Sequence, residues 1–451
     1  MIPTQDAELA RECRAAQFLL RHCEQMYYHN NGDLGIGTAS SIRDHTTPKS
    51  VARGFIMGSS SIFGARSAIF AALAAISCAG ADPGPADGDG GATTDGGAGA
   101  GLESAGSGGT ESGGSDSDSG KPEEKVDFVA GVSVDTLAGS ATPGHTDGPA
   151  SAARFDNPVN LVVTPQGDTY VSDFDNSAIR KVSADGTQVG TLFQDPRLVR
   201  PFGLALGADG TVYVEADGNP SGQVETTTGT IWSIDPITGE GTILAENTGR
   251  PRGLAYRDDG VLLLVDLATH DIRLMDPETS GITPFAGVSG QPGFTDGMRA
   301  SARFRSPYGT AWSPQSGDLV IADYGNHAVR TMTQDGLVKT LAGTGEPGMV
   351  DGHVSLAQFS GPKDVAVTAD GSVYVSDTGN HRVRIIRTDG TVETMAGNGR
   401  PGYSNGDGPS AEFFGQEGLD VHPQSGRLFV ADGTNGEPLP YHRIRELSLA
   451  P

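Results

Sequence analysis

Carboxylate, amide, imidazole and guanidinium side chains recur along this chain at one fixed spacing. The pattern Asp-x-x-Asn-His-x-x-Arg occupies residues 377–384 and again residues 323–330, and a looser copy, Asp-x-x-Asn-x-x-x-Arg, occupies residues 173–180. A carboxylate beside an imidazole has the residue types for acid–base catalysis or for binding a metal ion. Catalysis needs one copy whose surroundings differ from the rest. The regularity of the copies therefore argues against catalysis at any one of them.

A second set of carboxylates lies in four similar segments that begin with Pro-Gly, at residues 143–155, 292–304, 347–359 and 401–414. Their aspartates are Asp147, Asp296, Asp351 and Asp407. One interpretation is turn chemistry, in which Pro fixes φ, Gly adopts positive φ and Asp bonds its own backbone. The other is an acidic rim that binds Ca²⁺ or a cationic ligand, because hard cations prefer oxygen ligands. No Asp-x-Asp-x-Asp-Gly loop gathers several oxygens on one ion.

The residues around these motifs have the pattern of short β-strands. Residues 363–397 contain four runs rich in Val, Ile, Tyr and Thr, separated by two Asp-Gly pairs and by a Thr-Gly-Asn turn. Asp-Gly suits a tight hairpin because Gly takes positive φ without steric cost, and β-branched residues suit a pleated sheet. This unit is therefore predicted to be a four-stranded antiparallel meander.

The same unit recurs along most of the chain. It is opened by Pro158, Pro201, Pro251, Pro307 and Pro362, and by Gln416 in the sixth copy. A period of about 50 residues built from four strands is typical of β-propeller blades, which cover their apolar faces by stacking on each other. The sixth copy ends after its third strand, while residues 134–139 form a fourth-strand sequence before the first copy. We therefore predict an all-β fold, a six-bladed β-propeller of four-stranded antiparallel blades that is closed by an N-terminal strand.

The chain resembles the NHL-repeat proteins over about residues 130–451. The segments that carry the resemblance read DTGNHRVR, DYGNHAVR and DFDNSAIR. The resemblance implies that an aspartate at the end of each second strand accepts hydrogen bonds from turn amides, and that an arginine of the third strand pairs with a carboxylate. These framework residues are Asp173, Asp266, Asp323, Asp377 and Asp432, with Arg180, Arg273, Arg330, Arg384 and Arg445.

Two groups of propellers that resemble NHL proteins hold metal ions: the amidating lyases bind zinc through histidines, and gluconolactonase-like propellers bind a metal in the channel. Neither ligand set carries over onto this sequence. His327 and His381 occupy a position where histidine is usual in noncatalytic NHL repeats, a third histidine is not evident, and no Glu-Asn-Asp set aligns. We therefore predict no cofactor, with calcium as the one candidate ion.

The candidate binding residues follow the blade-opening positions. They come first on the innermost strands and are expected to ring the channel mouth on the face that carries the four Pro-Gly segments, called here the long-loop face. They differ from blade to blade, and an asymmetric ligand needs an asymmetric site. These candidates are Asn160, Arg252, Tyr308, Lys363, Asp364 and Glu417. The alternative is that they are solvated rim residues without a role.

The first part of the chain shares nothing with the repeat. Residues 1–56 are interpreted as a non-domain extension, and Met57 as a candidate true start. Residues 57–78 resemble a bacterial signal peptide with a lipobox-like end, Ala-Ile-Ser-Cys, which makes Cys78 the candidate lipidation site. Ordinary secretion and a short buried or membrane helix are the alternatives. Residues 79–125 are rich in Gly, Ala, Ser and Asp and are predicted to be a disordered tether to the propeller, residues 126–451.

The charge excludes one class of partner. The chain has 31 Lys and Arg residues against 56 Asp and Glu residues, with a net charge of −25, so it lacks the clustered cations that bind nucleic-acid phosphates. We predict an exported propeller of the bacterial cell envelope, anchored at the outer membrane through lipid on Cys78 or secreted, that binds a protein, peptide or glycan through its long-loop face. The alternative is a hydrolase or lyase of the same fold, lactonase-like or amidating-lyase-like, with a metal in the channel.

Overall fold

The computed structural model describes residues 126–437 and 440–449. The N-terminal extension (1–56), the signal peptide (57–78) with Cys78, and the tether (79–125) lie outside the described residues, so these assignments stay predictions. Within the described part of the chain, no helix has the length and apolar character needed to cross a membrane. Two short 3-10 helices, η1 (Tyr324–Asn326) and η2 (Thr378–Asn380), accompany the strands.

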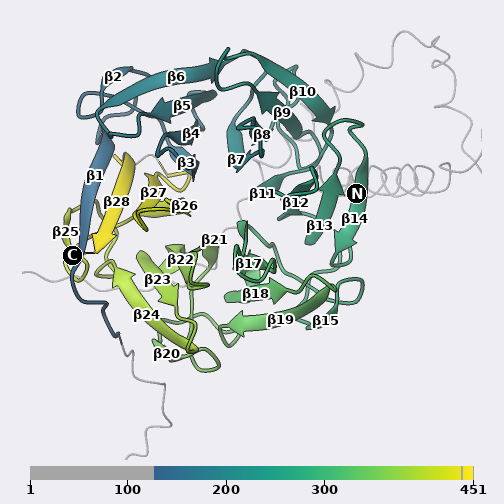
Figure 1. Cartoon of the computed structure of the whole chain (residues 1–451), viewed down its shortest axis with the longest axis vertical. Coiled ribbons are helices and arrows are strands. Elements are labelled where there is room, and N and C mark those ends of the chain that lie inside the picture. Colours follow the sequence, from purple (N-terminus) through teal and green to yellow (C-terminus); the bar gives the residue numbers. More distant parts are fainter. Residues whose placement is uncertain (1–125, 438–439, 450–451) are drawn as a thin grey trace, which may run out of the picture. The chain divides into compact units, whose positions relative to one another are not determined.

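Six antiparallel sheets surround a common axis, with β3, β7, β11, β21 and β26 innermost in Figure 1. From the axis outward, blade one contains β3 (Pro158–Val163), β4 (Thr169–Asp173), β5 (Ala178–Val182), β6 (Gln188–Gln194) and β2 (Gly148–Pro149). Blade two contains β7 (Pro201–Leu206), β8 (Val212–Ala216), β9 (Thr230–Ile234) and β10 (Gly241–Glu246). Blade three contains β11 (Pro251–Tyr256), β12 (Leu262–Asp266), β13 (Asp271–Met275) and β14 (Ile282–Ala286).

The other three blades are built in the same way. Blade four contains β16 (Thr310–Trp312), β17 (Leu319–Asp323), β18 (Ala328–Met332), β19 (Leu337–Ala342) and β15 (Gly297–Met298). Blade five contains β21 (Pro362–Val367), β22 (Val373–Asp377), β23 (Arg382–Ile386), β24 (Thr391–Ala396) and β20 (Gly352–His353). Blade six contains β26 (Gly415–Val421), β27 (Leu428–Gly433), β28 (His442–Leu449), β1 (Val132–Ser140) and β25 (Gly406–Asp407). The predicted six-bladed propeller is confirmed.

Four blades carry a fifth strand that the sequence did not predict. Each Pro-Gly segment runs along the outside of its own blade and adds a two-residue strand there: β2, β15, β20 or β25. The glycines that open these strands have φ between 122° and 147°, a region that side chains with a Cβ rarely adopt. The outer edges of blades one, four, five and six are thus partly covered, whereas blades two and three end in a fourth strand.

The N-terminal strand closes the ring, as predicted. β1 pairs antiparallel with β28 from Val132 opposite Leu449 to Ser140 opposite His442, so blade six combines both ends of the described chain. Just before β1, the chain also touches blade five. Val129 N donates to Thr394 O (2.9 Å), Thr394 N donates to Asp127 O (3.0 Å), and Asp127 N donates to Asp351 Oδ2 (2.7 Å). The N-terminal segment therefore joins two neighbouring blades.

The hydrophobic core lies between the blades. Strand residues such as Val171, Leu264 and Val430 are fully buried there, and each such side chain contributes about 1.5–3 kcal/mol of apolar burial. The Pro-Gly segments supply fully buried phenylalanines, each under the guanidinium of its own blade's framework arginine at 5.1–5.4 Å from the ring centre: Phe155, Phe304, Phe359 and Phe413. These rings anchor the long segments to the core.

Candidate functional site

The framework aspartates end the second strands and are buried against the arginines of the third strands. In blade five, Asp377 accepts hydrogen bonds from Ser360 N (2.7 Å), Asn380 Nδ2 (2.8 Å) and Arg384 Nη1 (2.7 Å). Burial raises the pKa of Asp377, and the Arg384 guanidinium opposes this rise. The same contact, at 2.6–2.9 Å, joins Asp173 to Arg180, Asp266 to Arg273, Asp323 to Arg330 and Asp432 to Arg445. This repeated contact is part of the scaffold.

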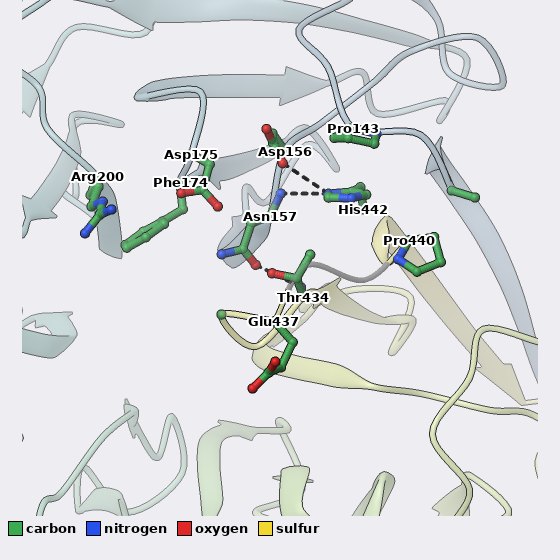
Figure 2. A pocket seen from close by; sticks show the side chains of 12 residues that line it. Pro143, Asp156, Asn157, Phe174, Asp175, Arg200, Thr434, Glu437, Pro440 and His442 are labelled. Atoms are coloured by element: carbon green, nitrogen blue, oxygen red, sulfur yellow. Dashed lines mark hydrogen bonds and ion pairs between the residues drawn. The ribbon is translucent and has the colours of Figure 1, made fainter. Parts of the chain in front are cut away.

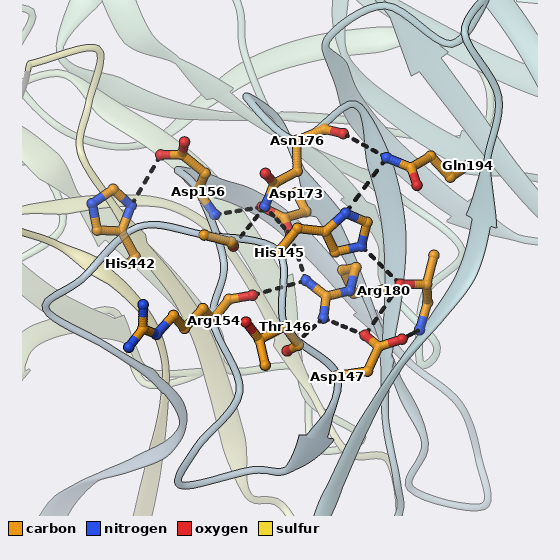
Figure 3. Close-up of polar contacts among 12 residues, drawn as sticks. His145, Thr146, Asp147, Arg154, Asp156, Asp173, Asn176, Arg180, Gln194 and His442 are labelled. Carbon is orange, nitrogen blue, oxygen red and sulfur yellow. Dashed lines mark hydrogen bonds and ion pairs between the residues drawn. The ribbon is translucent and has the colours of Figure 1, made fainter.

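Three of the four Pro-Gly segments place an aspartate against the outer side of the same arginines. Figure 3 shows Arg180 between Asp173 and Asp147, and Asp147 Oδ1 lies 2.5 Å from Arg180 Nη2. The equivalent contacts join Asp296 to Arg330 and Asp351 to Arg384. Burial alone would raise the pKa of Asp147, but the Arg180 guanidinium and the hydrogen bonds from Thr191 outweigh it and lower the pKa. Each arginine therefore links the long segment to the second strand of its blade.

In the fourth Pro-Gly segment, the residue at this place is Asn405 and not Asp407. Asn405 Oδ1 accepts from Arg445 Nη2 at 2.9 Å, while Asp407 bonds Ser410 within its own turn. The choice of Asp407 as the equivalent residue is corrected accordingly. The four candidate calcium ligands, Asp147, Asp296, Asp351 and Asp407, lie in four different blades. Among residues 126–437 and 440–449, no three His, Cys, Asp or Glu side chains are arranged to hold a metal ion.

The histidines lie at the junctions between blades. His327 Nδ1, from blade four, accepts a hydrogen bond from Gly361 N (3.0 Å), directly before the first strand of blade five. The same contact joins Ser306 N to His270 Nδ1 (2.9 Å) and Asn157 N to His442 Nδ1 (3.0 Å). His381 Nδ1 lies 3.2 Å from Phe414 O at the next junction. Burial lowers the pKa of His327, which favours the neutral ring that can accept this bond. These histidines hold neighbouring blades together.

Five of the innermost strands or their entrances send side chains to one cluster at the channel mouth. This mouth cluster consists of Phe202, Arg252, Tyr308, Lys363 and Glu417, one residue from each of blades two to six. Tyr308 OH donates to Glu417 Oε2 (2.8 Å), and Lys363 Nζ lies 3.0 Å from Glu417 Oε1. The Arg252 guanidinium stacks 4.0 Å from the centre of the Phe202 ring, which meets Tyr308 edge-on at 5.6 Å. The cluster therefore crosses the axis of the ring.

The structure divides the predicted mouth residues into two groups and buries most of both. Only 5–8% of the surface of Arg252, Lys363 and Glu417 is exposed, so these residues do not form the solvated rim of the alternative interpretation. Asn160 and Asp364, which were expected beside them, line a separate cavity of about 150 Å³ in the channel.

That channel cavity contains two carboxyl groups among Leu, Val, Ala and Gly. Asp364 Oδ2 accepts from Leu419 N (3.0 Å), and Asp420 Oδ2 accepts from Val163 N (2.8 Å), so each carboxylate bonds the inner strand of the next blade. Burial raises the pKa of Asp364 to about 8 and that of Asp420 to about 6. Both groups tie adjacent inner strands together.

Blade two carries two acidic residues at the mouth that sequence reasoning missed. Asp217 lies 2.7 Å from Arg252 and 3.0 Å from Arg250, and Glu215 is fully buried with its Oε2 3.8 Å from Arg252. Burial and the neighbouring Asp217 raise the pKa of Glu215 well above its usual range. The available signal was Ala216, which stands where the other blades have the framework aspartate, with a carboxylate on each side. Blade two therefore departs from the repeat at the position where it brings Glu215 and Asp217 to the channel mouth.

A larger pocket, of about 750 Å³, lies on the long-loop face where blade six meets blade one. This seam pocket is lined by Asp156, Phe174, Asp175, Arg200, Thr434 and His442, which Figure 2 shows converging from both blades. It is continuous with the mouth cluster, because Phe174 meets Phe202 edge-on at 6.0 Å. Asn435, in the turn of blade six beside the pocket, accepts from Lys363 Nζ at 2.6 Å. Sequence reasoning missed the pocket because its two sides come from opposite ends of the propeller sequence.

Comparison with known proteins identifies the repeat. Residues 359–386, which hold the framework pair of blade five, match the sequence model of the NHL repeat. The chain is a six-bladed propeller that contains an NHL repeat. The chain is 26% identical over 295 residues to the Arabidopsis thaliana protein SUPPRESSOR OF QUENCHING 1, chloroplastic, a match that covers 55% of this chain and 27% of that protein. It is 25% identical over 339 residues to human NHL repeat-containing protein 2, covering 69% of this chain and 41% of the human protein.

Solved structures share the propeller fold of this chain. A protein of unknown function from Bacteroides thetaiotaomicron superposes with a TM-score of 0.57 at 20% identity, covering 71% of this chain and 76% of that one. An auxiliary nutrient binding protein from Bacteroides ovatus gives a TM-score of 0.57 at 20% identity, covering 71% and 77%. The chain spans less than half the length of the curated relatives described above. These likenesses establish the architecture.

Proposed function

We propose that this NHL-type propeller is a binding module that holds a protein, peptide or glycan on its long-loop face, over the mouth cluster. One observation carries the proposal. Side chains that differ from blade to blade converge from five blades into one contiguous cluster, which continues into a pocket of about 750 Å³. Pockets of about 300–1,000 Å³ with a few placed polar groups are typical of ligand sites.

The chemistry of the mouth suits recognition. Tyr308 is partly exposed and stacks near both Phe202 and Tyr324, so an aromatic surface is available beside a buried charge pair. Tyrosine and arginine are enriched at binding hot spots because they combine apolar area with polar atoms. The scaffold contacts, by contrast, repeat around the ring, so they cannot fix the orientation of an asymmetric ligand. Two structural neighbours are described as auxiliary nutrient binding proteins, which accords with binding, although their likeness concerns the fold.

The proposed setting is the bacterial cell envelope. Export by the signal peptide, lipid on Cys78 and the tether of residues 79–125 would present the propeller at the outer membrane, or release it if cleavage occurs without lipidation. The NHL-type propeller would then meet its ligand outside the cytoplasm, with the tether holding the propeller away from the lipid surface.

The test is a ligand screen by melting shift on purified protein, followed by two matched variants. Lys363→Met removes the cation from the mouth cluster, and Lys339→Met removes a cation from the exposed outer strand of blade four. Any ligand found should lose affinity in the first variant and keep it in the second. Equal affinity in both variants would contradict binding at the mouth. Metal analysis of the same preparation separates the alternative, since stoichiometric zinc or calcium whose removal abolishes a turnover would favour the hydrolase or lyase.

A further inference from the structure

We propose that a pocket between blades three and four, on the face opposite the long-loop face, binds a proline-rich peptide segment in the polyproline II conformation. This opposite face carries the turns that join first to second strands and third to fourth strands, and it is called here the turn face. The proposal adds a second binding surface to the one proposed over the mouth cluster. It starts from aromatic residues that depart from the repeat.

Three aromatic side chains of blades three and four occupy positions that are aliphatic in most blades. The last residue of the first strand is Tyr256 in blade three and Trp312 in blade four. The other blades end this strand with Val or Leu, at Val163, Leu206, Val367 and Val421. The fourth strand of each blade has one bulge residue, which is Phe285 in blade three. The other blades have Leu or Met at the bulge, at Leu137, Leu192, Leu244, Leu341 and Met395.

These three aromatic residues line one pocket of about 660 Å³. Its other walls come from turns of the turn face: Asp258 follows the first strand of blade three, Pro314 follows that of blade four, and Gln334 lies between β18 and β19. All three aromatic side chains are partly exposed. A pocket of this size, lined by aromatic rings with a few polar groups, has the character of a ligand site.

Neighbouring side chains hold two of the rings in place. Tyr213 of blade two stacks on Tyr256, with the ring centres 5.6 Å apart and the planes 10° from parallel. The guanidinium groups of Arg257 and Arg299 lie 5.9 Å and 5.0 Å from the centre of the Phe285 ring. Rings fixed in this way offer a ligand a rigid surface, so little side-chain entropy is lost on binding.

Trp312 also brings an unused hydrogen-bond donor. Its Nε1 atom is buried and has no hydrogen-bond partner among residues 126–437 and 440–449. The other tryptophan, Trp232, donates from Nε1 to Thr230 Oγ1 at 3.0 Å. Buried indole N–H groups usually have a partner, and one without a partner costs free energy that a ligand acceptor can restore. The pocket therefore calls for a ligand that supplies an acceptor.

A proline-rich segment matches this set of groups. Proline has no backbone N–H, and a polyproline II helix has no internal hydrogen bonds, so its carbonyl groups are free to accept from Trp312. Its proline rings can pack on the aromatic walls, as in other aromatic-lined grooves that recognise such segments. A glycan would bring many hydroxyl groups, whereas several polar groups of the pocket are already paired. Gln334 Nε2 donates to Ser316 O at 2.7 Å, and the Thr333 hydroxyl donates to Asp335.

The charges around the pocket also suit an uncharged segment. Arg257 Nε lies 2.7 Å from Asp259 Oδ1. Asp258 lines the pocket and Arg299 lies over one of its rings, and both are exposed and of opposite sign. These four charges sum to zero, so the pocket does not demand a charged ligand.

The test uses decaproline with a fluorescein label and its mirror image made of D-proline. The two peptides have the same composition but form helices of opposite hand, and affinity is read by fluorescence anisotropy on the full-length protein. Wild type is expected to bind the L-peptide about tenfold more tightly than the D-peptide. Equal affinity for the two peptides, or no binding of either, would overturn the proposal. Displacement of the L-peptide by the neutral hexasaccharide cellohexaose would make the pocket a glycan site and would overturn it too.

Two variants locate the site. Trp312→Phe keeps a ring and removes the indole N–H, and Phe285→Leu gives blade three the bulge residue of blades one and two, Leu192 and Leu244. Each folded variant, checked by its melting temperature, should bind the L-peptide about five- to tenfold more weakly than wild type. Phe294→Leu is the matched control, because Phe294 is a 41% exposed aromatic residue of a Pro-Gly segment, and it should bind as wild type does. If both pocket variants bind as tightly as wild type, the peptide site is elsewhere.

The same peptide separates this inference from the proposed function. Binding that weakens in Trp312→Phe and Phe285→Leu but survives Lys363→Met supports the turn-face pocket, whatever the mouth cluster binds. Binding that is lost in Lys363→Met and unchanged in the two pocket variants places the peptide at the mouth and overturns the turn-face pocket.

Discussion

The structure predicts that two equivalent aspartates have very different effects on stability. Asp296 and Asp351 occupy the same place in blades four and five, and each binds its blade's framework arginine and a threonine hydroxyl. The side chain of Asp296 is 50% exposed, whereas that of Asp351 is 1% exposed. The difference comes from the N-terminal segment, because Asp127 N donates to Asp351 Oδ2. We therefore compare Asp351→Ala with Asp296→Ala.

The expected magnitudes follow from burial. Asp296→Ala breaks an ion pair screened by water, which typically contributes about 0.2–1 kcal/mol to the free energy of unfolding. Asp351→Ala removes one partner of a buried pair and leaves the Arg384 guanidinium fully buried, with Asp377 as its one remaining charged partner among the described residues, which typically costs about 3–5 kcal/mol. The two variants should thus differ by about 2 kcal/mol or more.

Urea denaturation followed by circular dichroism measures both free energies of unfolding. A third variant, Asp127→Pro, removes the backbone N–H that bonds Asp351 and leaves the Asp351 carboxylate in place. In a double-mutant cycle, Asp351→Ala should cost less in the Asp127→Pro background than in wild type, because the two residues interact directly. Equal costs for Asp296→Ala and Asp351→Ala, or strict additivity in the cycle, would refute the reasoning.

Three further predictions concern closure, pH and lipidation. Deleting residues 126–139 should lower the melting temperature far more than deleting residues 79–120, because the first deletion removes β1; equal melting points would mean that β1 does not close the ring. Burial lowers the pKa of His327 below its usual 6.5 in the folded state. The stability that its hydrogen bond with Gly361 gives is therefore fully present above pH 6.5 and is lost as the pH falls through the lower folded-state pKa. His327→Gln should flatten that part of the pH–stability profile, and an unchanged profile would contradict the role of this histidine. In a bacterial host fed radiolabelled palmitate, wild type should be labelled and Cys78→Ala should not, and an unlabelled wild type cleaved elsewhere would end the lipoprotein prediction.

The fold was predictable because its determinants repeat along the sequence. The Asp-Gly turns, the β-branched runs and the fourth-strand pattern of residues 134–139 are local signals, and together they give the number of blades and the way in which the ring closes. The two-residue outer strands were not predictable, because a pair such as Gly352–His353 carries no strand pattern of its own. They exist only because the long segment lies against the edge of its blade.

The candidate site was predictable only in part. The position directly after each blade-opening residue indicated Arg252, Tyr308, Lys363 and Glu417, and these four side chains lie together in the mouth cluster. Their burial depends on contacts across the ring, which one repeat does not disclose. Matching by residue type selected Asp407, whereas counting from Pro401-Gly402 gives Asn405.

The pairing of β1 with β28 also sets an order of events during synthesis. β1 is synthesised before the other strands of the propeller but cannot pair until β28 is available, because residues 442–449 leave the ribosome only after the other five blades have been synthesised. Until then blade six lacks its edge, and the seam pocket, whose walls come from blades one and six, does not exist. A chain that stops within blade six would therefore stack most of its sheets yet have neither a closed ring nor this pocket.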